Sequence, residues 1–450
     1  MKIFLKNVGP IKESSIEIKG LTVIAGENDT GKSTVSKALY SIISAFNNFE
    51  MEYKEALNDA LLDRLKTLYL VLRRNTRITT EEKMVRQFSP QGFLLRVIRP
   101  IWEEREAGFE SYDKNVAKNL KLLKDNGVEE SILAKAESEY SEIKKLLLAT
   151  VDEEGAKKES LRRILANEFH GQICNNSASE YEISAEENQE NIFHMTGNSE
   201  GKVLHASFEK LYYNDCIYLE SPFVLYMNDL LNSGRSFFSS RSSDLPKHTE
   251  DLLNRLKSVK SGREAQQYVF DLLEGKDYYN LHNRIGEMIR GDMFFDTEET
   301  RFKYSRKDGK SEKDFDLFNV AAGIKSLGIL QMLMKGKMLG DRCLIIIDEP
   351  EVHLHPKWQI EFAEVLVQLV SLTDSNVLIN THSPYFLNAL QVYVEKYKLT
   401  GKEHFYLSKK QGDNTEIVER TESINDIYKI LFEPFQKLED EKVDAEPDEE

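Results

Sequence analysis

Two glycines near the start of the chain, Gly26 and Gly31, bracket four residues and are followed at once by Lys32 and Ser33. This is the spacing G-x-x-x-x-G-K-[ST] without a mismatch. Glycines at both ends permit backbone angles that side chains block, so successive N–H groups can point at one phosphate. In this arrangement the lysine reaches the β- and γ-phosphates, and the serine hydroxyl binds Mg²⁺. The pattern predicts that ATP is bound by Gly26, Asn28, Asp29, Thr30, Gly31, Lys32, Ser33 and Thr34.

A pair of acids, Asp348 and Glu349, ends the apolar run that begins at Leu344. Such a run is typical of a strand buried on both faces of a parallel sheet. Acids at its carboxyl end lie where open α/β sheets bind ligands. We expect Asp348 to hold Mg²⁺ together with Ser33, and Glu349 to be the general base that activates the attacking water. The alternative is a strand that ends in acids by chance, which the complete phosphate loop upstream disfavours.

A histidine, His382, follows the next apolar run, Asn376 to Asn380, and precedes Ser383 and Pro384. A histidine at the end of a neighbouring strand can donate to the γ-phosphate or hold the attacking water. The alternative is an ordinary surface histidine. Its place on the strand after the acidic pair favours a catalytic role.

The phosphate loop needs a strand before it and a helix after it, and the sequence supplies both. Leu21 to Ala25 reads as a buried strand, and the residues from Ser33 to about Phe46 read as a helix whose positive end faces the loop. A glycine turn with a chance lysine, which is the alternative, requires neither element.

This chain contains three characteristic segments in combination. They are Gly26 to Ser33, Asp348-Glu349-Pro350-Glu351-Val352-His353-Leu354-His355-Pro356, and Thr381-His382-Ser383-Pro384. In this combination, over residues 1–46 and 203–430, the chain resembles the ABC-type ATPases of the SMC, RecF and OLD group, and the second segment resembles the OLD-like branch. The resemblance implies that His382 is the switch histidine and that residues 351–356 face a partner subunit. It also implies that ATP is sandwiched between the heads of a dimer or a higher homo-oligomer.

The same group has a signature loop that completes the partner's ATP site. Its best counterpart is the segment from Asn319 to Ser326, where Gly323 would let the backbone approach the γ-phosphate. Ala322 stands where the group has serine, and Lys325 or Ser326 could substitute for the missing hydroxyl. The glutamine of the group's glutamine loop is not evident. The expected strand ends in Glu220-Ser221-Pro222, and Gln172 is a candidate that an ordinary helix end explains equally well.

These segments predict an α/β fold, namely an ABC-type P-loop head with an antiparallel β subdomain and a large helical insertion. The expected parts are the first piece of the head (1–46), a helical insertion or arm (47–179), head strands (180–222), a helical subdomain (223–298), the last piece of the head (299–432) and an acidic disordered tail (433–450).

The bulk composition limits the function. The 450 residues contain no apolar run of 18 or more, so we expect no membrane span and no membrane partner. Three scattered cysteines, Cys174, Cys216 and Cys343, have no metal spacing and suggest a reducing cytoplasm. The net charge of −16 disfavours whole-protein steering toward DNA.

Only about 65 residues follow Ser383, and they show no second carboxylate cluster with metal spacing. We therefore expect no nuclease in the chain itself. The plan is similar to the stand-alone ATPases of bacterial defence systems, PtuA of Septu and AriA of PARIS. This likeness implies an anti-phage sensor or regulator that controls a separate nuclease or toxin and responds to DNA or a phage protein.

Two alternatives remain open. A DNA-repair ATPase of the RecF or SMC type would need a basic stripe, for which the candidates are Arg73, Arg74, Arg77, Arg96, Arg99, Arg162 and Arg163. Solvated helical faces paired with glutamates explain these arginines as well. The ATPase subunit of a membrane transporter is disfavoured by the large insertion and by the altered signature segment.

Overall fold

The computed structural model describes residues 1–75, 85, 87–149, 152–233, 245–259, 275–308, 311–340 and 342–445. The chain forms two compact units. The first, which we call the sheet unit, contains residues 1–47, 161–236 and 243–450. The second, which we call the helical unit, contains residues 48–160. The predicted α/β class is confirmed.

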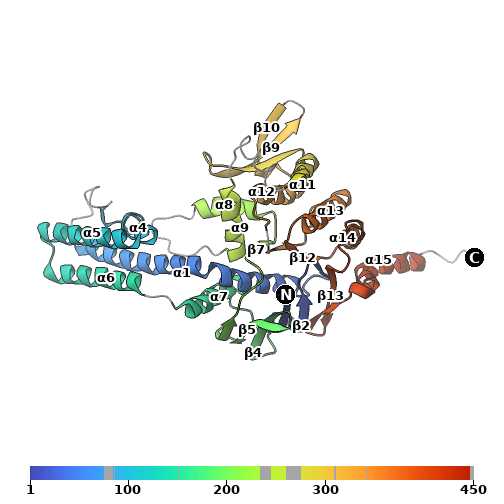
Figure 1. Cartoon of the computed structure of the whole chain (residues 1–450), viewed down its shortest axis with the longest axis horizontal. Helices are drawn as coiled ribbons and strands as arrows, with labels where there is room; N and C mark the ends of the chain where they lie inside the picture. The colour runs from blue at the N-terminus through green and yellow to red at the C-terminus, as the bar shows by residue number, and fades with distance from the viewer. Residues whose placement is uncertain are drawn as a thin grey trace, which may run out of the picture. The chain divides into compact units, whose positions relative to one another are not determined.

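The sheet unit is built on an eleven-stranded sheet with the strand order β6-β5-β4-β1-β2-β14-β13-β3-β12-β11-β7 (Figure 1). The strands are β1 (Lys2–Val8), β2 (Ile11–Glu17), β3 (Leu21–Gly26), β4 (Glu180–Glu187), β5 (Glu190–Asn198), β6 (Val203–Phe208), β7 (Asp215–Leu219), β11 (Cys343–Asp348), β12 (Asn376–Thr381), β13 (Glu403–Gln411) and β14 (Asn414–Glu419). From β13 to β7 the neighbours are parallel, whereas β6, β5, β4, β1 and β2 pair antiparallel. The sheet thus joins a parallel half to an antiparallel half, as the sequence predicted.

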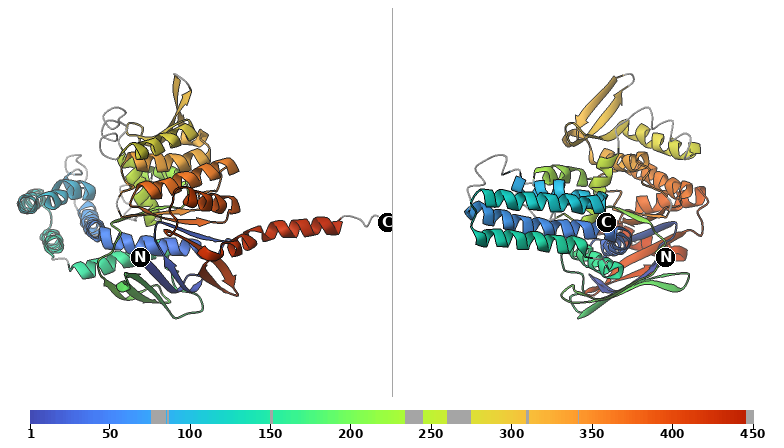
Figure 2. Two further views of the ribbon diagram at one scale, coloured as in Figure 1. Left: turned by 45° about the vertical axis from the view of Figure 1, so that its right-hand side comes forward. Right: turned by 60° about the vertical axis from the view of Figure 1, so that its left-hand side comes forward.

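Helices cover both faces of the parallel half (Figure 2). Successive side chains of a strand point to opposite faces, so Val23 and Ala25 of β3 enter one core while Ile24 enters the other. The first core is filled from helices such as α12 (Ala322–Lys335), α13 (Pro356–Leu372) and α14 (Pro384–Lys396). The second is filled from α1 (Lys32–Asn75). This double burial explains why β3 and β11 read as continuous apolar runs.

The remaining helices of the sheet unit are α8 (Val224–Ser233), α9 (Lys247–Ser258), α11 (Gly275–Ile289) and α15 (Asn425–Ala445). A second sheet has three antiparallel strands, β8 (Gly291–Asp296), β9 (Arg301–Asp308) and β10 (Ser311–Asp316), in the order β10-β9-β8. The sequence analysis did not predict β8.

The helical unit packs around its own core. Part of α1 lies beside α5 (Arg105–Asp125) and α6 (Glu130–Leu148) (Figures 1 and 2). The unit also contains the short α3 (Pro90–Phe93), a π-helix (Leu94–Ile98), α4 (Arg99–Glu103) and the first part of α7 (Glu153–Phe169). The core includes Leu61 and Leu65 of α1, Tyr112 of α5 and Tyr140 of α6. The sequence led us to expect a helical insertion or arm in this part of the chain.

Three boundaries differ from the sequence expectation. The first helix was expected to end near Phe46, yet α1 runs on to Asn75, because no glycine or proline interrupts it. The expected insertion of 47–179 corresponds to a compact helical unit of 48–160. The expected disordered tail from 433 is helical as far as Ala445 in α15. Arg77 lies outside the described residues.

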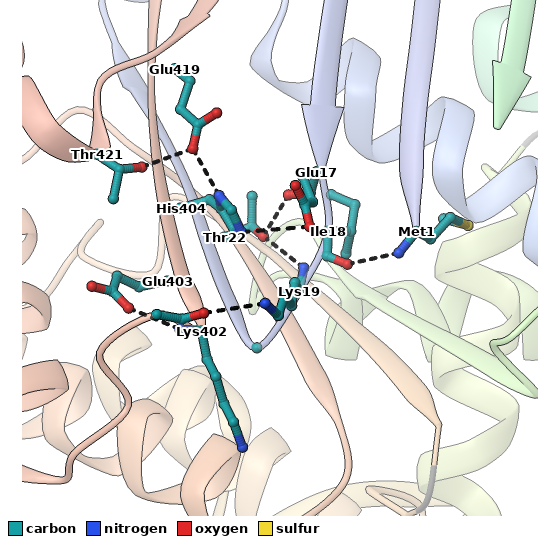
Figure 3. A network of polar contacts seen from close by, with 12 residues as sticks. Met1, Glu17, Ile18, Lys19, Thr22, Lys402, Glu403, His404, Glu419 and Thr421 are labelled. Atoms are coloured by element: carbon teal, nitrogen blue, oxygen red, sulfur yellow. Dashed lines mark hydrogen bonds and ion pairs between the residues drawn. The ribbon is translucent and has the colours of Figure 1, made fainter. Parts of the chain in front are cut away.

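A polar network lies at the start of β3, at the opposite end from the phosphate loop (Figure 3). Nδ1 of His404 is 2.8 Å from Oε1 of Glu419, and its Nε2 is 3.9 Å from Oε1 of Glu17. The hydroxyl of Thr22 donates to the carbonyl of Glu17 at 3.1 Å. These contacts connect β13, β14, β2 and β3 and so help to fix the strand that presents the phosphate loop. In the described part of the chain, none of the helices is long and apolar enough to cross a bilayer.

Candidate functional site

The predicted site lies at the carboxyl edge of three neighbouring parallel strands. β12 lies between β3 and β11, with Asp348 opposite Asn380 and Ala25 opposite Thr381 in the register. The phosphate loop follows β3, the acidic pair ends β11, and His382 follows β12. Three segments that are far apart in sequence therefore meet at one edge, which is where open α/β sheets bind ligands.

Gly26 and Gly31 leave no room for a side chain. A Cβ atom on Gly26 would lie 2.1 Å from the carbonyl oxygen of Ser408, and one on Gly31 would lie 2.9 Å from Cγ of Pro10. Gly31 also has a φ of +76°, in the left-handed region that favours glycine. Both glycines thus let the loop lie directly against its neighbours.

Lys32 is buried under the loop that it serves. Its Nζ donates to the carbonyl oxygens of Gly26 at 3.0 Å and Glu27 at 2.6 Å. Burial lowers the pKa of Lys32, against the carboxylates of Glu349 and Asp348, which raise it. A lysine whose ammonium group is hydrogen-bonded to the loop carbonyls is close enough to bind a phosphate held by the same loop.

The other loop residues divide into structural and exposed groups. Thr30 is buried, and its hydroxyl donates to the carbonyl of Glu27 at 2.7 Å. Asn28 and Asp29 are exposed. Asp29 pairs with Lys410 of β13 at 2.9 Å, and this contact lowers the pKa of its carboxyl. Thr34 on the first turn of α1 lies against Gly9, at 3.2 Å from the position of an added Cβ.

Asp348 is buried and surrounded by donors. It accepts hydrogen bonds from the Tyr218 hydroxyl at 2.8 Å, the Ser36 hydroxyl at 3.1 Å and Nδ2 of Asn380 at 2.5 Å. Burial raises the pKa of Asp348, although hydrogen bonds from these groups and from Ser33 lower it. A cation beside this carboxylate would offset the cost of burying it.

The groups at this edge fit a magnesium nucleotide. A hydroxyl on Ser33 and a carboxylate on Asp348 are oxygen ligands of the kind that Mg²⁺ takes, with substrate phosphates completing its shell. Among the residues that the structure describes, buried Oδ1 of Asn380 and Oε2 of Glu351 have no hydrogen-bond partner. Acceptors left without a donor at the edge of the site are consistent with a place for bound water or a cation.

Glu349 and His382 face one another across the edge. Oε1 of Glu349 is 3.5 Å from Nδ1 of His382, and both side chains are about 40% exposed. Glu349 has a φ of +47°, which is unusual for a residue with a side chain, and its N–H donates to the carbonyl of Asn380 at 2.8 Å. This turn breaks the alternation of β11 immediately after Asp348. Strain of this kind is found where a fold positions a functional side chain.

Glu351 has a part in the site that the sequence did not reveal. It is buried, and Oε1 accepts from the Thr381 hydroxyl at 2.6 Å, the N–H of His382 at 2.9 Å and the N–H of Ser383 at 3.2 Å. The sequence assigned Glu351 only to the loop that faces a partner. The carboxylate instead turns inward and holds the segment that carries His382.

Ser36, Tyr218 and Asn380 were also missed. Ser36 lies one helical turn after Ser33, a spacing that places two side chains on one face of α1. Asn380 occupies a buried position of an apolar strand, where a polar residue is a signal in itself. Nothing in the sequence around Tyr218 indicated that it would contact the site.

The signature segment is largely engaged within the fold. A Cβ on Gly323 would lie 2.5 Å from Cδ2 of Leu354, so this glycine allows α12 to approach the acidic-pair loop. Lys325 is buried, and its Nζ bonds to the Tyr226 hydroxyl and lies 4.5 Å from the centre of that ring. Ser326 is buried and donates to the carbonyl of Ala322 at 3.4 Å. The start of α12 has no side-chain cap, so its backbone N–H groups are the part of this segment that is suited to bind a phosphate.

The two glutamine-loop segments lie in different places. Glu220 follows β7 directly, and β7 pairs with β11 through Leu219 and Ile347. Gln172 follows α7, where its N–H donates to the carbonyl of Phe169 at 2.8 Å as at a helix end.

This parallel sheet, with a glycine loop after one strand and acids after another, defines the class of P-loop nucleoside triphosphatases. A family model described as the AAA ATPase domain matches residues 1–387, and the chain belongs to this family. ATP is accordingly the nucleotide that the family implies, typically with Mg²⁺.

An OLD nuclease of Thermus scotoductus (strain ATCC 700910 / SA-01) is 21% identical to this chain over 184 residues, which are 36% of this chain and 34% of the nuclease. The chain thus spans about a third of that relative's length. An SMC head domain from Thermotoga maritima is 11% identical, covering 93% of this chain and 97% of its own, with a TM-score of 0.34. The SmcHead bound to the C-winged helix domain of ScpA is 11% identical, covering 93% and 96%, with a TM-score of 0.41.

Proposed function

We propose that this ATPase binds ATP through Gly26, Asn28 to Thr34 and Asp348, and that it hydrolyses ATP with Glu349 as the general base. The observation that carries the proposal is the meeting of Lys32, Asp348, Glu349 and His382 at one sheet edge, from three separate strands. The carboxylates of Glu349 and Asp348 lie close enough to Lys32 to oppose the lowering of its pKa by burial, although burial prevails.

Each of these residues has a separable task. Lys32 would leave the carbonyls of Gly26 and Glu27 to contact the β- and γ-phosphates. Magnesium, when bound by Ser33 and Asp348, supplies positive charge to the phosphates. Glu349 accepts a proton from the attacking water, and His382, 3.5 Å away, orients that water or donates to the γ-phosphate.

We also propose that two copies assemble around ATP, head to head or in a higher homo-oligomer. Three aromatic side chains form a row beside the signature segment. The rings of Phe223 and Phe318 each stack with the ring of Tyr226, at 6.0 and 4.8 Å, and Phe318 is 74% exposed. The ring of Phe223 also contacts His353 of the acidic-pair loop edge-on at 5.6 Å. Exposed stacked aromatics are typical of the buried centre of an interface.

Nucleotide binding by a matched pair of variants tests the ATPase proposal. Lys32→Ala removes the ammonium under the loop, whereas Lys12→Ala removes an exposed ammonium from β2. We expect Lys12→Ala to bind and hydrolyse ATP like the unaltered protein, and Lys32→Ala to lose binding or turnover by at least a hundredfold. Equal turnover by both variants would refute the site.

The biological role that we propose is an anti-phage sensor or regulator that controls a separate nuclease or toxin. The partial match to an OLD nuclease supports an association between this type of ATPase and a nuclease. DNA or a phage protein would be the trigger. Plaque assays with the ATPase alone, and with the product of the neighbouring reading frame, test this role. Protection that needs Lys32 and the neighbour supports it, and DNA-stimulated turnover without any partner would instead favour a repair ATPase.

A further inference from the structure

The helical unit contains a cavity of about 340 Å³, to which the proposed ATPase mechanism assigns no role. Its lining comes from three helices, α1, α4 and α7. The lining residues are Phe49, Glu50, Tyr53, Lys54, Trp102 and Glu153. The volume is at the lower end of the range for ligand sites, so it suits one side chain together with the peptide groups next to it.

Three aromatic side chains form part of this lining. Phe49 and Tyr53 are four residues apart, so they lie on one face of α1, and Trp102 comes from α4. Tyr53 and Trp102 also pack against the core of the helical unit. Because this packing restricts the two rings, the aromatic wall of the cavity is formed before a ligand arrives.

The indole nitrogen of Trp102 is a donor without an acceptor. Among the residues that the structure describes, the buried Nε1 of Trp102 has no hydrogen-bond partner. A buried N–H without an acceptor is costly, and such groups are nearly always paired in folded proteins. A ligand that brings a carbonyl oxygen to Trp102 would remove this cost.

An ammonium group of the chain itself shows which charge these residues attract. Nζ of Lys157 is 5.2 Å from the centre of the Phe49 ring and 2.7 Å from Oε1 of Glu153. An aromatic face and a carboxylate that both line the cavity thus hold a cation between them. Glu50, which follows Phe49 on α1, gives the lining a second carboxylate.

Lys54 is the lining residue whose charge opposes a cation. It is exposed and lies four residues after Glu50, at the spacing of neighbours on a helix. A positively charged ligand would therefore be attracted by the rings and the carboxylates and repelled by Lys54. An anion would experience the opposite forces, so the effect of removing Lys54 reveals the charge of the ligand.

We infer that this cavity binds an arginine side chain of a partner protein. A guanidinium is flat, stacks on aromatic faces and donates to carboxylates in pairs, so it fits rings beside Glu50 better than an ammonium does. The carbonyl next to the arginine would accept from Nε1 of Trp102. The helical unit then has a function of its own, which is to recognise a basic segment of another protein. Recognition of this kind is separate from the proposed ATPase function and does not depend on nucleotide binding.

Tryptophan fluorescence tests this inference, because the chain has two tryptophans, Trp102 and Trp358. In the full chain carrying Trp358→Phe, the whole tryptophan signal comes from the cavity. The probe is the peptide acetyl-Gly-Arg-Gly-amide, and its neutral counterpart carries citrulline, which has the shape of arginine without the charge. We expect the arginine peptide to change the Trp102 emission and to bind about tenfold more tightly than the citrulline peptide.

Two substitutions on α1 give the sign of the charge effect. Glu50→Gln should weaken binding of the arginine peptide several-fold, and Lys54→Ala should strengthen it several-fold. The matched controls are Glu110→Gln and Lys114→Ala, because this exposed pair has the same spacing on α5. Neither control should change binding. All four side chains are exposed, so we expect each of these variants to fold.

Equal binding of the arginine and citrulline peptides, or an unchanged affinity in Glu50→Gln, would overturn the inference. Weaker binding in Lys54→Ala would overturn it as well, because the cavity would then prefer an anion. A Trp102 emission that stays constant at every peptide concentration has the same meaning. If Trp358→Phe does not fold, calorimetric titration of the unaltered protein and of Trp102→Phe replaces the fluorescence, and Trp102→Phe should bind the arginine peptide several-fold more weakly.

Discussion

The carboxylate of Glu351 accepts a hydrogen bond from the backbone N–H of His382 across 2.9 Å, although the two residues belong to different loops. The same oxygen accepts from Thr381 and Ser383, and is 3.4 Å from Nδ1 of His382. The loop after β11 thus determines where the loop after β12 places its histidine. Any movement of the acidic-pair loop, for example against a second copy, would reach His382 through this carboxylate.

Replacing Glu351 should therefore uncouple hydrolysis from binding. Glu351→Ala leaves three donors without their acceptor, so we expect kcat to fall about tenfold or more while the affinity for ATP changes little. Steady-state kinetics of phosphate release with a separate binding titration measures both. Glu361→Ala, which removes a carboxylate from the α13 surface, is the control. Equal losses of affinity and turnover would contradict a positioning role for Glu351.

The general-base assignment makes a different prediction. Glu349→Gln keeps the shape of the side chain but cannot accept a proton, so hydrolysis should fall by about a hundredfold to ten-thousandfold while ATP stays bound. Phosphate release and the retention of radiolabelled ATP on the protein measure the two effects. Normal turnover by Glu349→Gln would rule out this base. Because ATP persists, the same variant should also accumulate any ATP-dependent assembly.

The aromatic row should be needed for that assembly. Phe318→Glu places a charge on the most exposed ring beside the signature segment, so the Glu349→Gln protein carrying it should remain monomeric with ATP. Size-exclusion chromatography with light scattering measures the mass with and without ATP. Phe435→Glu changes another exposed phenylalanine, on α15, and is expected to assemble normally. A dimer of Phe318→Glu would show that this face is not the interface.

The elements of the site could be predicted because each is a local pattern. Two apolar runs, Val23 to Ala25 and Leu344 to Ile347, are buried on both faces of the sheet. Each run therefore predicts a strand, and the end of the run predicts where the edge of the sheet lies. The spacing of Gly26, Gly31 and Lys32 is equally local. The order of the parallel strands, which the structure shows, brings these segments together.

The supporting contacts could not be predicted, because they join residues that are distant in sequence. Glu168 and His248 are 80 positions apart, and Tyr218 and Asp348 are 130 apart. In each pair, the sequence around one residue does not indicate which residue it contacts. The strand β8 was missed for a related reason, since its pairing with β9 and its packing on α12, rather than a long apolar run, define it. The continuation of α1 to Asn75, by contrast, was readable from the absence of helix-breaking residues.

The stability of the protein should depend on pH through His248. Its pKa of about 9 in the folded chain lies above the ordinary value of 6.5. A group whose pKa is raised by folding contributes its full stability below the unfolded value, and this contribution is lost as the pH rises through the folded value. The free energy of unfolding should therefore decline between about pH 6.5 and 9, by up to ~3 kcal/mol from this group.

Urea unfolding at a series of pH values, compared between the unaltered protein and His248→Gln, isolates this contribution. The difference in unfolding free energy between the two proteins should be largest at pH 6.5 and should shrink toward pH 9, because only the protonated imidazole bonds well to both Glu168 and Glu220. The His404→Gln protein serves as the reference for replacing a histidine elsewhere. A difference that stays constant across this range would show that His248 is not protonated in the folded chain.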